Sequence, residues 1–287
     1  MKIILLMIIS LWMAPLYAAT FIGSPEEAKK QAKSSQSDCI IMIYGGDWNR
    51  QGKVFQEKCW NENILKTGID SSTIVSTLCS PQTTDSEQNK QANEQKKNVG
   101  VSYSSLPALS FLDKNGFEYC SLSGDKLPRN ATTLMARIRQ IQALRQKRDD
   151  LLEKSKSMSG VNQAKLLGSA GEINGLNRPP SILNDLKKCD PEDQSGYIKR
   201  FTFDVWSLHQ YMKSSKEEAL AALDKELAAK GLTADQKQQI YGVRGMILLR
   251  NKASADELRD NFKKMNALNP QSINGKAAVQ AALIYAK

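Results

Sequence analysis

The sequence predicts an α/β domain with a central mixed sheet, followed by an all-α domain of helical hairpins. Continuous apolar runs at 39–44 and 108–112 are rich in residues that favour strands covered on both faces. Helical patterns lie between these runs, and only helical patterns occur from about residue 131 onward. A length of 287 residues allows two ordinary domains, and a hydrophobic fraction of 41% is typical of globular proteins.

Residues 1–19 are expected to be a signal peptide rather than part of the fold. Lys2 gives a basic start, the run Ile3–Met13 is apolar apart from one serine, and small residues follow at Ala18 and Ala19. This run is shorter than the roughly 20 residues that a membrane-spanning helix needs. We therefore expect an extracytoplasmic protein, periplasmic or secreted, without a transmembrane segment after cleavage. The alternative is an uncleaved anchor.

The α/β domain should begin with a helix and a buried strand. Ser24-Pro25-Glu26-Glu27 combines a capping serine, a first-turn proline and a capping-box glutamate, which predicts a helix as far as Ser35. Gly45-Gly46 should end the strand that follows. The next elements are predicted in this order: a strand at 39–44, a helix that starts at Asp47 or Asn49 and reaches about Trp60, and a strand at 73–78.

The same domain should close with a hairpin. The segment 80–97 is polar and has the composition of an inserted loop or a solvent-facing helix. Leu106-Pro107 then precedes the strand at 108–112. Asn115-Gly116 favours the positive backbone angles of a hairpin turn, so a return strand is predicted at 117–122.

The rest of the chain should be helical, beginning with a long connecting helix at 131–158. Glycines and prolines separate the later helices, as short hairpin connections require. These helices are predicted at 161–173, 181–189, 197–212, 216–230, 234–251, 254–268 and 274–286. The Ala-Leu-Asn-Pro segment at 267–270 loosely resembles tetratricopeptide-type hairpin arrays, which usually present concave surfaces to other proteins.

One segment of the first domain resembles a known motif. The strand at 39–44 is followed by Gly45-Gly46-Asp47-Trp48-Asn49-Arg50-Gln51-Gly52-Lys53 and a helix. This arrangement resembles the thioredoxin-like fold, where a Trp-Cys-x-x-Cys-Lys motif lies at the strand-to-helix turn. Leu106-Pro107 and the hairpin after it resemble that fold's cis-proline loop and closing strands. The resemblance covers about residues 24–123 and implies a thioredoxin-like domain at 20–130, followed by a helical domain at 131–287.

The chain departs from the motif at both reactive positions. If Trp48 and Lys53 align with the flanking residues, Asn49 replaces the attacking cysteine and Gly52 replaces the resolving one. Disulfide exchange needs a thiolate nucleophile and a second thiol that captures it. Asparagine is instead a good helix cap, so we expect the Asn49 side chain to bind the first-turn amides. The pattern indicates a fold that is retained for another use.

Five cysteines are present: Cys39, Cys59, Cys79, Cys120 and Cys189. The number is odd, so at least one thiol should be free or intermolecular. A Cys39–Cys59 disulfide is one alternative, and the other is that these are small buried hydrophobic residues. Cys79 should end a strand parallel to the first and lie near Gly45 and Pro107.

Charge and composition limit the other partners and cofactors. The formal net charge is +10, spread over both halves without the dense basic stripe of a nucleic-acid groove. The single histidine, His209, excludes a histidine-rich metal centre and is expected to be a helical packing or surface residue. No glycine-rich phosphate loop or zinc spacing occurs, so no cofactor and no metal are expected.

Two functions remain open. The first is a non-catalytic thioredoxin-fold protein of the cell envelope, a scaffold or chaperone-like module that binds other polypeptides or an anionic envelope component. Its binding residues would be Trp48, Asn49, Leu106 and Pro107, because thioredoxin-like domains hold extended peptides along the cis-proline loop. The alternative is a thiol-disulfide oxidoreductase or isomerase that uses Cys79 alone.

Overall fold

The computed structural model describes residues 19–70, 72–80 and 86–285. The chain divides into two compact units: unit 1 comprises 1–150 and 171–179, and unit 2 comprises 151–170 and 180–287. Residues 1–18, which hold nearly all of the predicted signal peptide, lie outside the described part. Within the described part, no helix combines the length and the apolar character needed to span a membrane.

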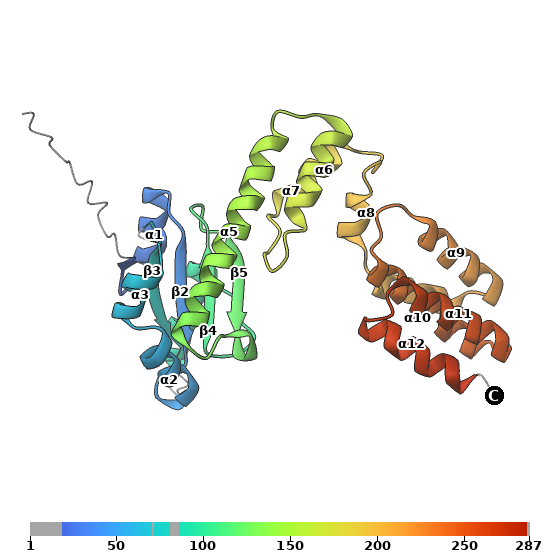
Figure 1. The fold of residues 1–287 in the computed structure, drawn as a ribbon, viewed down its shortest axis with the longest axis horizontal. Helices are drawn as coiled ribbons and strands as arrows, with labels where there is room; N and C mark the ends of the chain where they lie inside the picture. The colour runs from blue at the N-terminus through green and yellow to red at the C-terminus, as the bar shows by residue number, and fades with distance from the viewer. Residues whose placement is uncertain (1–18, 71, 81–85, 286–287) are drawn as a thin grey trace, which may run out of the picture. The chain divides into compact units, whose positions relative to one another are not determined.

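Unit 1 is built on a five-stranded mixed sheet (Figure 1). The strands are β1 (Thr20–Phe21), β2 (Cys39–Tyr44), β3 (Ile74–Cys79), β4 (Ala108–Leu112) and β5 (Glu118–Ser123). Their order across the sheet is β1-β3-β2-β4-β5. The first three of these run parallel, β4 is antiparallel to β2, and β5 is antiparallel to β4. A mixed sheet of this order, with helices around it, fits a thioredoxin-like fold.

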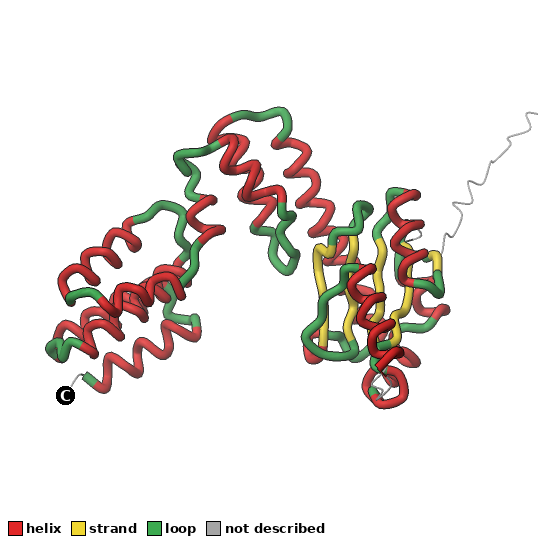
Figure 2. Tube along the Cα trace, turned by 180° about the vertical axis from the view of Figure 1, so that it is seen from behind, coloured by secondary structure: helices red, strands yellow, loops and turns green. Residues whose placement is uncertain are grey.

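Helices cover both faces of this sheet (Figure 2). They are α1 (Pro25–Ser35), α2 (Arg50–Cys59), α3 (Glu62–Gly68), α4 (Ser86–Val99) and the first turns of α5 (Ala131–Ser155). Side chains alternate along β2, so Ile40 and Met42 pack with α2, α3 and α5. Ile41 and Ile43 pack with α1 and Val99 on the other face. This two-sided burial explains why β2 is apolar at successive positions.

Local signals that were visible in the sequence act as expected in unit 1. The Ser24 hydroxyl accepts a hydrogen bond from the Glu27 N–H at 3.3 Å, which caps α1. Asp113 accepts from the Asn115 and Phe117 N–H groups at 2.9 and 3.0 Å and closes the β4–β5 turn. The polar segment after β3 is a helix, α4, in its described residues.

Unit 1 extends beyond the predicted boundary at residue 130. Leu134, Ile138 and Ile141 of α5 are fully or almost fully buried against the sheet, because they form one apolar stripe at helical spacing. The segment 171–179 also returns to β5, where the Asn177 side chain donates to the Glu118 carbonyl at 3.0 Å. The connecting helix therefore belongs in large part to the α/β unit.

Unit 2 is helical throughout its regular elements. Its helices are α6 (Gly160–Gly171), α7 (Ser181–Cys189), α8 (Tyr197–Thr202), α9 (Lys216–Ala228), α10 (Ala234–Arg250), α11 (Ala255–Leu268) and α12 (Ile273–Ile284). Capping boxes at Ser215, Thr233 and Ser254 start α9, α10 and α11. Because a capping box determines where a helix begins, the first residues of these three helices could be predicted from the sequence.

The predicted helix at 197–212 was wrong. Helix α8 ends at Thr202, and a separate 3-10 helix covers Trp206–Lys213. The Asp204 side chain accepts from the Trp206 N–H at 2.9 Å, and this local bond competes with a continuous helix. His209 lies in the 3-10 helix, with its ring stacked on Trp206 at a centroid distance of 5.2 Å.

Candidate functional site

Three chain segments meet at one edge of the sheet in unit 1. The register pairs Tyr44 with Cys79 and Ile43 with Ala108. The carboxyl ends of β2 and β3 therefore lie beside the start of β4. We call this the motif edge and define it as Gly45–Gly52, Cys79, Ser80, Leu106 and Pro107. All five residues predicted for the site, Trp48, Asn49, Leu106, Pro107 and Cys79, belong to it.

A tight turn connects β2 to α2 at the motif edge. Gly46–Trp48 forms one turn of 3-10 helix, and Gly46 has a φ of +67°, a conformation that glycine adopts without steric cost. A Cβ atom at Gly45 would overlap the ring of Trp48. The Trp48 side chain therefore lies back over the Gly45 backbone while 49% of it remains exposed. This leaves an aromatic surface at the end of the sheet.

The capping role predicted for Asn49 was wrong. Asn49 occupies the N-cap position of α2, but its side chain makes no capping hydrogen bond. Capping requires an extended backbone, and the preceding 3-10 turn gives Asn49 a ψ of 76° instead. Its Oδ1 atom is buried and has no hydrogen-bond partner among the described residues. The side chain lies over Gly52, where an added Cβ would overlap Oδ1.

Asn49 and Gly52 are thus in direct contact. Gly52 is buried, and the Asn49 amide occupies the space that any larger side chain there would need. Neither residue has a sulfur atom, so no disulfide can link these two positions. The group at the N-terminus of α2 is instead the neutral amide of Asn49, which lies over Gly52.

The loop before β4 has a cis peptide bond between Leu106 and Pro107. Pro107 is buried, and its carbonyl accepts from the Gly124 N–H at 3.3 Å. The N–H and C=O of Leu106 have no hydrogen-bond partner among the described residues, although most backbone polar groups are paired in folded proteins. Sequence reasoning named Leu106 but could not show that its backbone is unpaired.

Cys79 is the exposed thiol of the motif edge. All five cysteines lie in the described residues and are free, and Cys79 alone among them is exposed. Its sulfur lies 3.2 Å from where a Cβ at Gly46 would be. The Tyr103 hydroxyl donates to the Ser80 hydroxyl at 3.2 Å and ties the next residue to the loop before β4.

The other thiols are poor nucleophiles. Burial raises the pKa of Cys39 to about 12 and that of Cys120 to about 11. Burial also raises the pKa values of Cys59 and Cys189. Cys39 and Cys59 belong to clusters on opposite faces of the sheet, so the Cys39–Cys59 disulfide considered above does not form.

The motif edge therefore combines an aromatic ring, an unpaired backbone segment and one exposed thiol. It offers the Trp48 ring, the unpaired backbone of Leu106 and the Cys79 thiol. The described residues contain no group of three or more side chains that could hold a metal ion. Sequence reasoning missed a polar cavity at the opposite edge, because its walls come from segments that are far apart in the chain.

No protein-family model matches the chain, and no curated protein matches it. Among solved structures, one described as "DsbH Oxidoreductase" is similar, with 19% sequence identity and a TM-score of 0.35. The match covers 44% of this chain and 88% of that chain. At this score the likeness carries no argument, so the fold assignment depends on the strand order: a mixed sheet with flanking helices that fits a thioredoxin-like fold.

Proposed function

We propose that the chain is an exported, non-catalytic thioredoxin-fold protein that binds other polypeptides at the motif edge. The observation that carries this proposal is the unpaired backbone of Leu106 beside the cis bond to Pro107. An extended peptide can pair with such a backbone by strand addition, and its side chains supply specificity. The exposed part of the Trp48 ring adds apolar contact area on the same edge.

The substituted motif supports binding without disulfide exchange. A bound peptide at this edge would meet Asn49 where the motif has its attacking thiol, and the amide cannot form a mixed disulfide. Contact between Asn49 and Gly52 also leaves no room for a second reactive side chain. The bound polypeptide is therefore released chemically unchanged, as a scaffold or chaperone-like module of the cell envelope requires.

The helical unit completes this proposal. We infer a tetratricopeptide-like use of its hairpins as a second protein-binding surface, on the signature at 267–270 and the consecutive packing of α9 to α12. The proposed organisation is a signal peptide at 1–19, a thioredoxin-like domain without its cysteine motif, and a helical domain that the long helix α5 introduces.

The direct test uses an unfolded polypeptide without free thiols, such as reduced and carboxymethylated lactalbumin. Its binding to the full chain is measured by fluorescence anisotropy for wild type, Trp48→Ala and Trp206→Ala. Trp206 is a matched control because it is 75% exposed and lies in unit 2. We expect Trp48→Ala alone to weaken binding, by about tenfold if the ring is a central contact. Equal affinities for all three proteins would remove Trp48 from the site.

A second function has one observation in its favour, the exposed Cys79 thiol at the motif edge. As an isomerase, the Cys79 thiolate would attack a substrate disulfide, break its S–S bond and release one substrate thiolate. A second substrate thiolate would then attack the mixed disulfide and restore Cys79, so no external oxidant is consumed. Disulfide isomerisation by wild type that is lost in Cys79→Ser would establish this function in place of the first.

A further inference from the structure

A groove between α11 and α12 in unit 2 combines apolar residues of one helix with basic residues of the other. Its volume is about 360 Å³, which lies in the usual range of small-molecule sites. The α12 residues in the lining are Ala278, Val279, Ala282 and Leu283. The α11 residues in the lining are Arg259, Phe262, Lys263 and Asn266. Each set follows the spacing of a single helix face, so the groove lies between one face of each helix.

The α12 side of the groove is apolar and open to solvent. Leu283 is 64% exposed, and Val279 is also exposed. Phe262 extends this surface from α11, with its ring stacked on that of Tyr285 at a centroid distance of 6.2 Å. The last helix of an array usually presents a polar outer face, whereas α12 contains one charged residue, Lys276. An apolar molecule in the groove would remove this surface from water, which is favourable.

The charged residues of the groove have one sign. Arg259 and Lys263 line it, and no carboxylate of the described residues does so. They are four residues apart on α11, so their side chains are neighbours on the helix surface. Lys263 has no ion pair or hydrogen bond among the described residues. Arg259 pairs with Asp256, which lies outside the lining and is 81% exposed, so this ion pair is weak and the groove favours an anion.

The walls suit an alkyl chain better than a peptide. Backbone N–H and C=O groups inside helices are paired within the helix, so α11 and α12 offer few partners to the backbone of a bound peptide. A peptide buried here would leave polar groups unpaired, which is unfavourable, whereas an alkyl chain has no such groups. The Asn266 amide has no hydrogen-bond partner among the described residues and can donate to an anionic head group.

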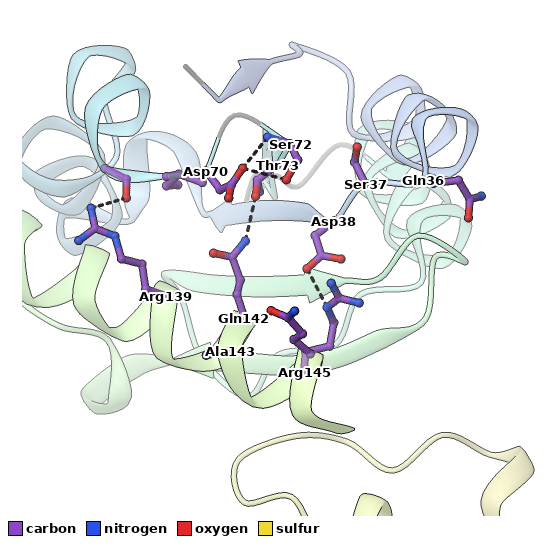
Figure 3. A pocket seen from close by; sticks show the side chains of 13 residues that line it. Gln36, Ser37, Asp38, Asp70, Ser72, Thr73, Arg139, Gln142, Ala143 and Arg145 are labelled. Atoms are coloured by element: carbon purple, nitrogen blue, oxygen red, sulfur yellow. Dashed lines mark hydrogen bonds and ion pairs between the residues drawn. The ribbon is translucent and has the colours of Figure 1, made fainter. Parts of the chain in front are cut away.

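The polar cavity beside Asp38 in unit 1 lacks this charge selectivity (Figure 3). Its volume is about 540 Å³. The charged residues that line it are two acids and two bases, Asp38, Asp70, Arg139 and Arg145. Asp38 is only 7% exposed and pairs with Arg145 Nε at 2.9 Å. The charges of this cavity therefore balance and favour a ligand of neither sign, in contrast to the groove between α11 and α12.

We propose that the α11–α12 groove binds a free fatty acid, with its alkyl chain along α12 and its carboxylate at Arg259 and Lys263. Hydrogen bonds between charged partners are about twice as strong as neutral ones, so two basic donors favour a carboxylate over an uncharged head group. The alkyl chain covers the exposed Val279 and Leu283 side chains. This site lies in unit 2 and is independent of polypeptide binding at the motif edge.

Matched probes separate the charge from the chain. Calorimetric titrations of the full chain compare decanoate with decylammonium, which has as many carbon atoms and the opposite charge, and with octanoate, which is two methylene groups shorter. All three are used below the concentration at which they form micelles. We expect decanoate to bind about tenfold or more tightly than either of the others. Equal binding in either comparison, or no binding of decanoate, overturns the proposal. Binding to phosphatidylglycerol vesicles without binding of soluble decanoate also overturns it and would indicate a membrane-docking surface.

Two pairs of variants locate the binding. Leu283→Asp places a carboxylate in the lining, whereas Ile284→Asp places it outside the lining at the next position of α12, which is 71% exposed. Lys263→Gln removes a charge from the lining, and Lys264→Gln removes the same charge from the next residue, outside it. All four positions are exposed, so the variants should fold. We expect Leu283→Asp and Lys263→Gln to weaken decanoate binding by about tenfold and the two controls to leave it unchanged. Equal affinities within either pair contradict the proposal.

Discussion

A methyl group added at Gly52 should destabilise unit 1 through its contact with Asn49. The added Cβ would overlap Asn49 Oδ1 and lie 3.1 Å from the Cβ of Tyr44. Overpacking of this kind costs about 1–3 kcal/mol. Alanine in place of glycine inside a helix returns about 1 kcal/mol. The net expectation for Gly52→Ala is a loss of about 0–2 kcal/mol in the free energy of unfolding.

The dependence on Asn49 makes this prediction specific. In an Asn49→Ala background the overlap with Oδ1 disappears, so Gly52→Ala should be neutral or stabilising by up to about 1 kcal/mol. The two substitutions should therefore couple by about 1–3 kcal/mol in a double-mutant cycle.

The assay is urea unfolding in a Trp206→Phe background. In that background the described tryptophans, Trp48 and the buried Trp60, both report on unit 1. If Gly52→Ala has the same effect with and without Asn49, the proposed contact between these two positions does not exist.

Three further predictions concern the burial of the cysteines and the ion pair between Asp38 and Arg145. Native alkylation should modify Cys79 rapidly and Cys39 only on unfolding, as mass spectrometry of the labelled chain would show; rapid labelling of Cys39 would contradict its burial. Burial raises the pKa of Cys39 to about 12, so the folded protein keeps the thiol proton at pH values where the unfolded chain loses it. The free energy of unfolding therefore decreases as the pH rises above the unfolded pKa near 9. Wild type should therefore lose more stability than Cys39→Ala from about pH 8 to 10 in denaturant titrations, and parallel curves would refute this. Arg145→Met should cost about 3–5 kcal/mol, because it leaves Asp38 buried without its ion pair; a loss below about 1 kcal/mol in urea unfolding would show that the pair is unimportant.

Much of the architecture could be predicted because local physics determines it. Apolar runs define β2 and β4, and capping boxes mark the starts of α9, α10 and α11. The helix predicted at 197–212 failed because a single Asp204 side-chain bond interrupts it. The domain boundary predicted at residue 130 differs from the observed unit. The apolar stripe of α5 indicates that this helix packs against another element, but the sequence does not show that this element is the sheet.

The position of the candidate site could be predicted from the sequence, but the contacts between its residues could not. The order of Trp48, Asn49 and Pro107 along the chain places them at one edge once the strand order is known. Their contacts depend on backbone angles that the sequence does not display: the ψ of Asn49 removes its capping bond. The cavity beside Asp38 was not predicted, because its charge balance depends on residues of α5 that reach it only after packing.

Amide hydrogen exchange at Leu106 shows whether a polypeptide pairs with the backbone of the motif edge. The measurement follows the Leu106 N–H of the full chain with and without the carboxymethylated polypeptide, which has no free thiol. We expect the polypeptide to slow exchange at Leu106, because strand addition gives this N–H its missing partner. The same protection should occur in Cys79→Ser. Unchanged exchange at Leu106 under conditions where the polypeptide binds would contradict the claim that the motif edge is the binding site.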